Sequence, residues 1–224
     1  MKSFSLKLFP ALSLLLLSAP VPGAVAGAGT ATVSVSTRAA AEPTSAVREL
    51  VEEAKRYKDE NEKGISAEEK KKRLEAKAGM SAILNLREMS RLILKNHWAK
   101  LKETERKKYS DLMSALVEKI GYPQISKYFN GEIEIGYEGE KSLPGGDYAV
   151  LTRIVYKSED LTLSTEFHAH KTASGWRIYD VLTDGDSLLL IYRNQHMGII
   201  KEKGFPHLIK LMEKKLRGGA KSEK

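Results

Sequence analysis

The feature that most constrains the fold is a run of strand-like segments in the second half of the chain. Each segment is rich in apolar residues and bounded by turn residues, and its alternate positions define two faces, which is typical of a strand. Four segments have this pattern, at residues 133–137, 148–157, 161–170 and 176–182. The links between them are short and rich in turn residues, so consecutive strands are expected to pair as an antiparallel meander.

The first half of the chain has helical periodicity. Apolar residues recur at helical spacing over residues 47–57 and 109–120. Ser66 to Glu69 has the spacing of a capping box, which opens a further helix. We expect Gly121 to end the helix before it and Pro123 to lie in the turn that follows.

A strand, a tight turn and an amphipathic helix follow one another in residues 176–204. Strict alternation would place Ile178 and Asp180 on the same strand face. Gly185 suits the turn, and Ser187 is available to cap the helix. The helix face that should be buried contains Leu188, Ile191, Tyr192, Gln195 and Ile199.

These patterns predict an α+β domain in which N-terminal and C-terminal helices roof a curved, four-stranded antiparallel sheet. Periodicity alone leaves two alternatives for the roofed face. It is either packed solid or it encloses a cavity.

The N-terminus has the features of an export signal. Residues 1–26 combine two early lysines, a short apolar run and a small-residue cleavage site. We therefore expect a signal peptide at 1–26, a flexible leader at 27–42, one domain at 43–217 and a flexible tail at 218–224. The chain has no cysteine, which excludes a disulfide framework and a thiolate metal site.

The chain is basic, with a formal net charge of +8. Cleavage after residue 26 would remove two lysines and leave +6. Nucleic acid, anionic lipid headgroups and an acidic partner all suit such a charge. Export makes nucleic acid the least favoured partner, and a diffuse positive excess is typical of a solvated surface.

Two groups of residues are candidates for chemistry. Glu166, His168 and His170 share one strand face, but the outer two are separated by about 13 Å at ~3.3 Å per residue. One metal ion does not reach both, so an exposed polar face is the preferred interpretation and no metal site is predicted. Asp180, on an apolar strand face, could act as a buried base or as a structural carboxylate.

The order and spacing of several residues resemble a known family. Trp176, Ile178, Asp180, Val181, Gly185, Ser187, Leu188, Tyr192, Arg193 and Gln195 resemble the motif of the periplasmic phospholipid carriers (MlaC-like, or toluene-tolerance, proteins). The chain departs from the common pattern at Asp186, at His196 and at the Leu84-Asn85 pair, where the family often has Phe-Asp.

The resemblance implies an NTF2-like or cystatin-like sheet around a hydrophobic cavity that holds the acyl chains of a glycerophospholipid. It implies a periplasmic monomer without catalytic activity or cofactor. Such a carrier moves lipid between an outer-membrane lipoprotein complex and an inner-membrane ABC transporter complex, which maintains outer-membrane lipid asymmetry. Some relatives are associated with hopanoids, and an acid–base enzyme that uses Asp180 is the other alternative.

Nine residues are predicted to line the cavity, and five to form the structural corner between sheet and helix. The predicted lining consists of Trp98, Leu116, Val150, Thr152, Ile154, Leu163, Phe167, Leu189 and Tyr192. The predicted corner consists of Trp176, Asp180, Gly185, Ser187 and Arg193.

Overall fold

The computed structural model describes residues 41–58, 62–129 and 132–218. The predicted signal peptide and most of the predicted leader and tail therefore lie outside the described residues. None of the described helices is long and apolar enough to cross a membrane.

The predicted antiparallel meander is confirmed, and a short fifth strand extends it. The strands pair in chain order and are β1 (Ile133–Ser142), β2 (Tyr148–Tyr156), β3 (Leu161–Thr172), β4 (Gly175–Thr183) and β5 (Asp186–Ser187). Short 3-10 turns at Pro144–Gly146 and Lys157–Glu159 join the first three strands. Thr152, Thr165 and Thr183 lie opposite one another on β2, β3 and β4, so they share one face of the sheet.

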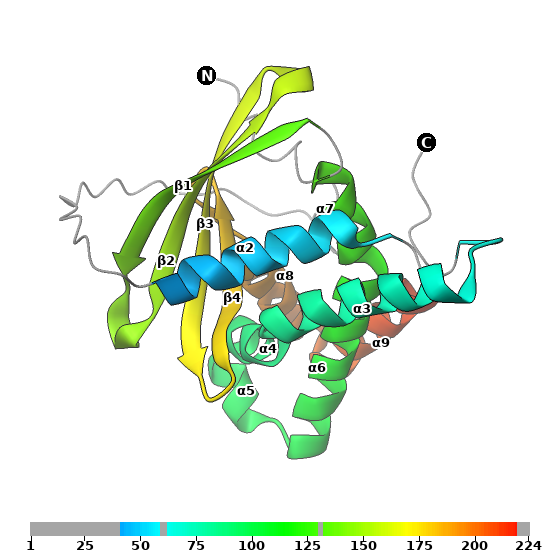
Figure 1. Cartoon of the computed structure of the whole chain (residues 1–224). Helices are drawn as coiled ribbons and strands as arrows, with labels where there is room; N and C mark the ends of the chain where they lie inside the picture. Colours follow the sequence, from blue (N-terminus) through cyan, green and yellow to red (C-terminus); the bar gives the residue numbers. More distant parts are fainter. Residues whose placement is uncertain (1–40, 59–61, 130–131, 219–224) are drawn as a thin grey trace.

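Helices cover this sheet from both ends of the chain. Those before it are α2 (Ala41–Arg56), α3 (Ala67–Ile83), α4 (Leu86–Leu94), α5 (Asn96–Lys100), α6 (Glu103–Leu116), the π-helix η2 (Val117–Gly121) and α7 (Tyr122–Phe129). Those after it are α8 (Leu188–Lys203) and α9 (Phe205–Gly218). Figure 1 shows α2 running across the sheet, with α3 beside it and α4, α6, α8 and α9 grouped below.

The predicted start of α3 is confirmed, whereas the predicted end of the helix at Gly121 is wrong. The Ser66 hydroxyl accepts a hydrogen bond from the Glu69 amide at 3.1 Å. Beyond α6, the chain continues through η2 directly into α7. Pro123 is the second residue of α7, inside this continuous helical path, where it has no N–H to donate to a carbonyl of the preceding turn.

A β-bulge in β4 overturns the prediction that Asp180 shares a face with Ile178. Ile178 pairs with Ala169 and Asp180 pairs with His168, so the register shifts by one residue between them. The extra residue is Tyr179, whose ring contacts both His168 and His170 on the outer face. Asp180 is thereby turned away from the roofed face, and Val181 faces the helices instead.

The buried stripe of α8 also differs from the predicted one. Its buried residues are Leu189, Tyr192, His196 and Ile199, whereas Ile191 and Gln195 are half-buried. His196 is 2 % exposed, and its Nδ1 lies 2.7 Å from the hydroxyl of Tyr109 on α6. A histidine therefore belongs to the core that α4, α6, α8 and α9 form.

This buried histidine predicts a loss of stability in mild acid. Burial lowers the pKa of His196 from 6.5 to about 4, so the folded state favours the neutral ring. The stability from this group is complete above pH 6.5 and is lost as the pH falls toward 4, by about 3 kcal/mol in total. Denaturant unfolding between pH 4 and 7 measures this loss.

The matched variant is His196→Gln, which keeps a polar partner for Tyr109 but does not titrate. Its free energy of unfolding should depend less steeply on pH over the same interval. An equal pH dependence of the free energy of unfolding in the variant and in wild type would contradict the assignment of this loss to His196.

Candidate functional site

A cavity lies between the roofed face of the sheet and the helices. Its volume is about 110 Å³. The walls come from α2, the α3–α4 link, α4, η2, α7, three strands and the start of α8. The lining residues are Leu50, Val51, Leu84, Leu86, Met89, Val117, Gly121, Ile125, Phe129, Ile154, Tyr156, Thr165, Phe167, Val181, Leu188 and Tyr192.

The surface of this cavity is entirely apolar. No oxygen or nitrogen atom of the lining residues is exposed to it. The hydroxyl of Thr165 is buried and has no hydrogen-bond partner, and it too is hidden from the cavity. A charged or strongly polar ligand group would lose its hydration here without compensation. The cavity therefore suits hydrocarbon.

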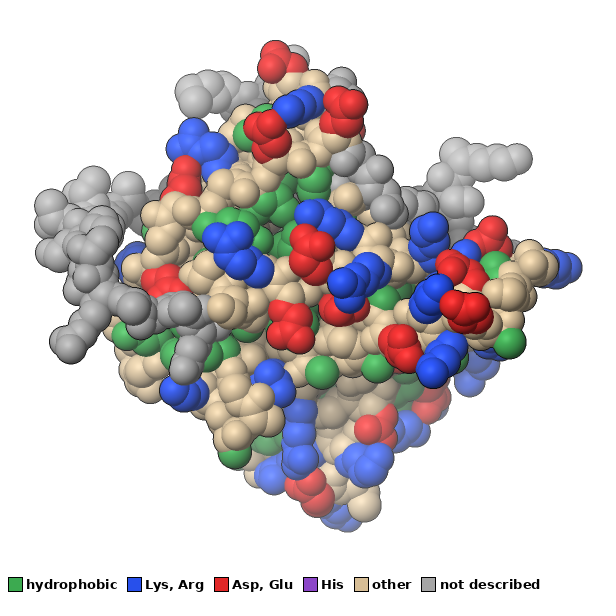
Figure 2. Space-filling model, in the orientation of Figure 1, with side chains coloured by type: hydrophobic (Ala, Val, Ile, Leu, Met, Phe, Trp, Pro, Cys, Tyr) green, Lys and Arg blue, Asp and Glu red, His purple; other side chains and the backbone are tan. Residues whose placement is uncertain are grey.

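Apolar residues continue from the cavity toward the tip of the sheet. Ile154 and Tyr156 line the cavity and also form a cluster with Leu163, against which Ile133, Ile135 and Leu161 pack. Figure 2 shows hydrophobic side chains gathered in a hollow between this tip and α2. The apolar surface thus extends from the interior to the outside along β1, β2 and β3.

Three of the nine predicted lining residues lie at the cavity, namely Ile154, Phe167 and Tyr192. The other six are placed elsewhere. Val150 and Thr152 are buried on the same face of β2, and Leu163 belongs to the cluster at the tip of the sheet. Trp98, Leu116 and Leu189 pack in the helical core. Contact of these nine residues with a lipid remains a prediction.

Sequence reasoning missed several lining residues, and the reasons differ. Leu50 and Val51 belong to the predicted apolar face of the first helix, so the sequence pattern already indicated that they would be buried. Val181 was assigned to the wrong face because of the bulge. Leu84 and Val117 belong to apolar helical patterns in the sequence, but a pattern does not show that one lies in a link and the other in a π-helix, both at the cavity.

The corner between sheet and helix is built around Asp180. One carboxylate oxygen accepts a hydrogen bond from the Ser187 hydroxyl at 2.6 Å. The other accepts from the amides of Val181 and Leu189, at 2.8 and 2.9 Å. Burial raises the pKa of Asp180, and these hydrogen bonds oppose the increase. Asp180 is not among the residues that line the cavity.

Gly185, Ser187 and Arg193 hold the same junction, whereas Trp176 lies near the other end of β4. Gly185 forms the tight turn with φ of +88°, which non-glycine residues rarely adopt. Ser187 caps α8 through the amide of Leu190 at 3.1 Å. Arg193 donates to the carbonyl of Leu92 at 3.0 Å, which ties α8 to α4. Trp176 packs its ring edge-on against Tyr148.

The outer face of the sheet holds the histidines that were considered as metal ligands. His168 lies 3.4 Å from a carboxylate oxygen of Glu166, and His170 lies 2.8 Å from the side-chain nitrogen of Asn85. Among residues 41–58, 62–129 and 132–218, no group of three His, Asp or Glu side chains is placed to hold a metal ion. Asn85 also caps α4 through the amide of Glu88 at 3.0 Å.

Comparison with known proteins identifies the family. The family model described as MlaC protein matches residues 47–214. A search of curated proteins finds no match. Among solved structures, the phospholipid-binding protein of Ralstonia solanacearum, in complex with a phospholipid, has a similar fold with a TM-score of 0.60. Its sequence is 15% identical, and the match covers 78% of this chain and 94% of that one. Because the family model spans most of the chain, the protein belongs to the MlaC family.

Proposed function

We propose that this protein is a periplasmic carrier that shields the acyl chains of a glycerophospholipid in its apolar cavity. The observation that supports this proposal best is a cavity whose lining exposes no polar atom and continues into an apolar hollow at the surface. Family membership supports it, as does the phospholipid in the complex of the Ralstonia solanacearum protein. The charged headgroup would remain outside, near the tip of the sheet.

The energetics explain why a carrier is needed. At about 0.8 kcal/mol per buried methylene, two chains of roughly 15 methylenes resist transfer into water by on the order of 24 kcal/mol. The protein replaces water around the chains during transfer. Release then requires a second apolar site, which fits exchange with protein complexes in the outer membrane and in the inner membrane. The proposed partners are an outer-membrane lipoprotein complex and an inner-membrane ABC transporter complex, and the proposed role is maintenance of outer-membrane lipid asymmetry.

The cavity must widen when lipid enters. Pockets for drug-sized ligands occupy about 300–1,000 Å³, several times the cavity of about 110 Å³. A lipid with two acyl chains is larger still, so the sheet and the helices must move apart during loading. A hopanoid-type lipid is a second candidate for the same apolar space.

An acid–base enzyme that uses Asp180 is less well supported. Both carboxylate oxygens of Asp180 accept hydrogen bonds from the protein. The bulge turns the side chain away from the cavity, so a ligand in that cavity would not meet it.

Native mass spectrometry of protein purified from membrane-containing cells tests the proposed function. We expect an added mass equal to one phospholipid, and extraction of the sample should recover that lipid. An apo mass under gentle ionisation would contradict the carrier function. Recovery of a hopanoid alone would leave a carrier but change its cargo.

A further inference from the structure

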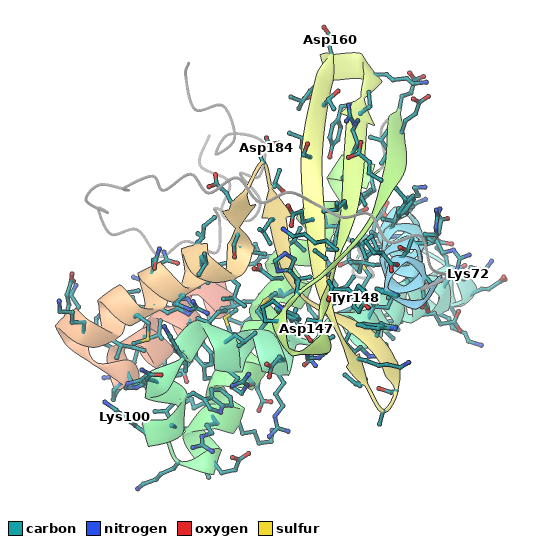
Figure 3. The ribbon with its side chains drawn as sticks, turned by 90° about the vertical axis from the view of Figure 1, so that its left-hand side faces the viewer. Lys72, Lys100, Asp147, Tyr148, Asp160 and Asp184 are labelled. Atoms are coloured by element: carbon teal, nitrogen blue, oxygen red, sulfur yellow. The ribbon has the colours of Figure 1, made fainter. Side chains whose placement is uncertain are left out.

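The charge of the protein is divided between its sheet and its C-terminal helices. Residues 132–187 contain eleven Asp and Glu and five Lys and Arg, for a net charge of −6. Residues 188–218 contain seven Lys and Arg and two Glu, for a net charge of +5. In Figure 3, Asp160 lies at the top of the sheet and Asp184 lies below it, whereas Lys100 of α5 lies at the lower left. A formal excess of positive charge is therefore concentrated on one part of the surface.

The strongest part of this positive surface is a stripe on α9 and the end of α8. It consists of Lys201, Lys203, Lys210, Lys214 and Arg217, which we call the α9 face. All five side chains are exposed. Within the described residues, none of the five forms a salt bridge. In α9, residues 210, 214 and 217 have the spacing that aligns side chains along one side of a helix.

The opposite side of α9 fixes the helix in the core. Phe205, Leu208, Ile209 and Met212 are buried there. The apolar side is therefore not free to insert into a bilayer, as it is in a peripheral amphipathic helix. Any binding through the α9 face would be electrostatic, and it would leave the fold unchanged.

We propose that the α9 face docks the carrier on the surface of an anionic lipid bilayer. Lysines near an anionic membrane each contribute attraction without a specific geometry. Protein interfaces, in contrast, are enriched in aromatic anchors and depleted in lysine. The exposed residues between 201 and 217 are the five cations, Glu202 and Pro206, and no aromatic residue is among them. The composition of the α9 face thus fits a charged lipid surface better than a protein.

The acidic sheet sets the orientation of the docked protein. Asp160 lies at the tip of the sheet, next to Leu161 of the apolar cluster, and an anionic surface repels it. Docking through α9 would hold this tip, and the apolar hollow beside it, away from the bilayer. Lipid would then be exchanged with membrane proteins rather than directly with the bilayer. This inference goes beyond the proposed carrier function, because docking does not require an occupied cavity.

Vesicle binding by two charge-matched variants tests the proposal. The first variant is Lys210→Gln, Lys214→Gln and Arg217→Gln. The control is Lys70→Gln, Lys71→Gln and Lys72→Gln on α3, where all three lysines are exposed and the net charge changes by the same amount. Co-sedimentation would use vesicles of phosphatidylcholine with about 30% phosphatidylglycerol in about 50 mM salt. We expect the α9 variant to bind the vesicles on the order of a hundredfold more weakly than wild type. The affinity of the control variant should fall by less than about threefold.

Orientation can be measured because the chain has no cysteine, so a single introduced cysteine carries the only label. A spin label at Glu202→Cys should be relaxed by a paramagnetic lipid headgroup, and a label at Asp160→Cys should not. The opposite order of relaxation would overturn the orientation.

Three further outcomes would overturn the proposal. Equal losses in the α9 variant and the control would show that binding follows net charge alone. Absence of wild-type binding to anionic vesicles would exclude bilayer docking. Binding to poly-glutamate but not to vesicles would indicate an acidic protein surface instead. Native mass spectrometry of the α9 variant should show unchanged lipid content, so a failure of docking is distinguishable from a failure of the carrier function.

Discussion

Val181→Trp should abolish lipid binding while the protein stays folded. Val181 lies on the inner face of β4 and lines the cavity of about 110 Å³. The indole would occupy space that a lipid chain needs. If the indole excluded only about four methylenes of an acyl chain from the cavity, the free energy of lipid binding would weaken by roughly 3 kcal/mol. That is more than a hundredfold in affinity. Native mass spectrometry should therefore find the variant without bound lipid.

The same substitution on the other face of the sheet is the matched control. Val155 is half-buried on β2 and pairs with Thr162 and Glu134 on the outer face. Val155→Trp should keep wild-type lipid content. Overpacking by Val181→Trp costs about 1–3 kcal/mol of stability, which thermal unfolding would detect separately. A folded Val181→Trp protein with a full lipid complement would refute the cavity as the lipid site.

Asp180→Ala should lower the free energy of unfolding by about 3–5 kcal/mol. The carboxylate is 5% exposed and accepts three hydrogen bonds, from one hydroxyl and two amides. Its removal leaves two buried donors and one partly buried donor without a partner, each at a cost of about 1–3 kcal/mol. Denaturant unfolding measures the difference, and lipid content of the folded fraction should be unchanged.

Two other substitutions separate structure from catalysis at this corner. Asp186→Ala, on the exposed residue of β5, should change stability by less than about 0.5 kcal/mol. Asp180→Asn keeps one acceptor oxygen and should cost less than Asp180→Ala. If Asp180→Asn folded and retained lipid normally yet abolished a measurable activity, the enzyme alternative would gain support over a structural role.

The periodic parts of the fold could be predicted from the sequence because each depends on local alternation. The four long strands follow from period-two patterns, and the cap at Ser66 follows from chemistry within one helical turn. The path through Gly121 and Pro123 could not be predicted, because a π-helix that ends at Gly121 continues directly into α7, which contains Pro123.

The site was less predictable because its geometry depends on contacts between distant segments. Burial of His196 depends on Tyr109, which lies 87 residues away in sequence. Leu84 reaches the cavity because the α3–α4 link forms a bridge with Ile178 of β4. The bulge at Tyr179 is a matter of hydrogen-bond register, which a pattern of residue types does not reveal.

The bulge in β4 separates two chemically different compartments by a single residue. With Tyr179 accommodated as an extra residue, Val181 faces the apolar cavity and Asp180 faces the helix junction. Strict alternation through Ile178, Tyr179 and Asp180 would direct the carboxylate into the apolar interior, whereas the bulge absorbs Tyr179 and keeps the carboxylate outside. Deletion of Tyr179 would leave Ile178, Asp180 and Val181 on their present faces, because their partners on β3 are already consecutive. The bulge, rather than the order of residue types along β4, therefore determines which side chains meet the cavity.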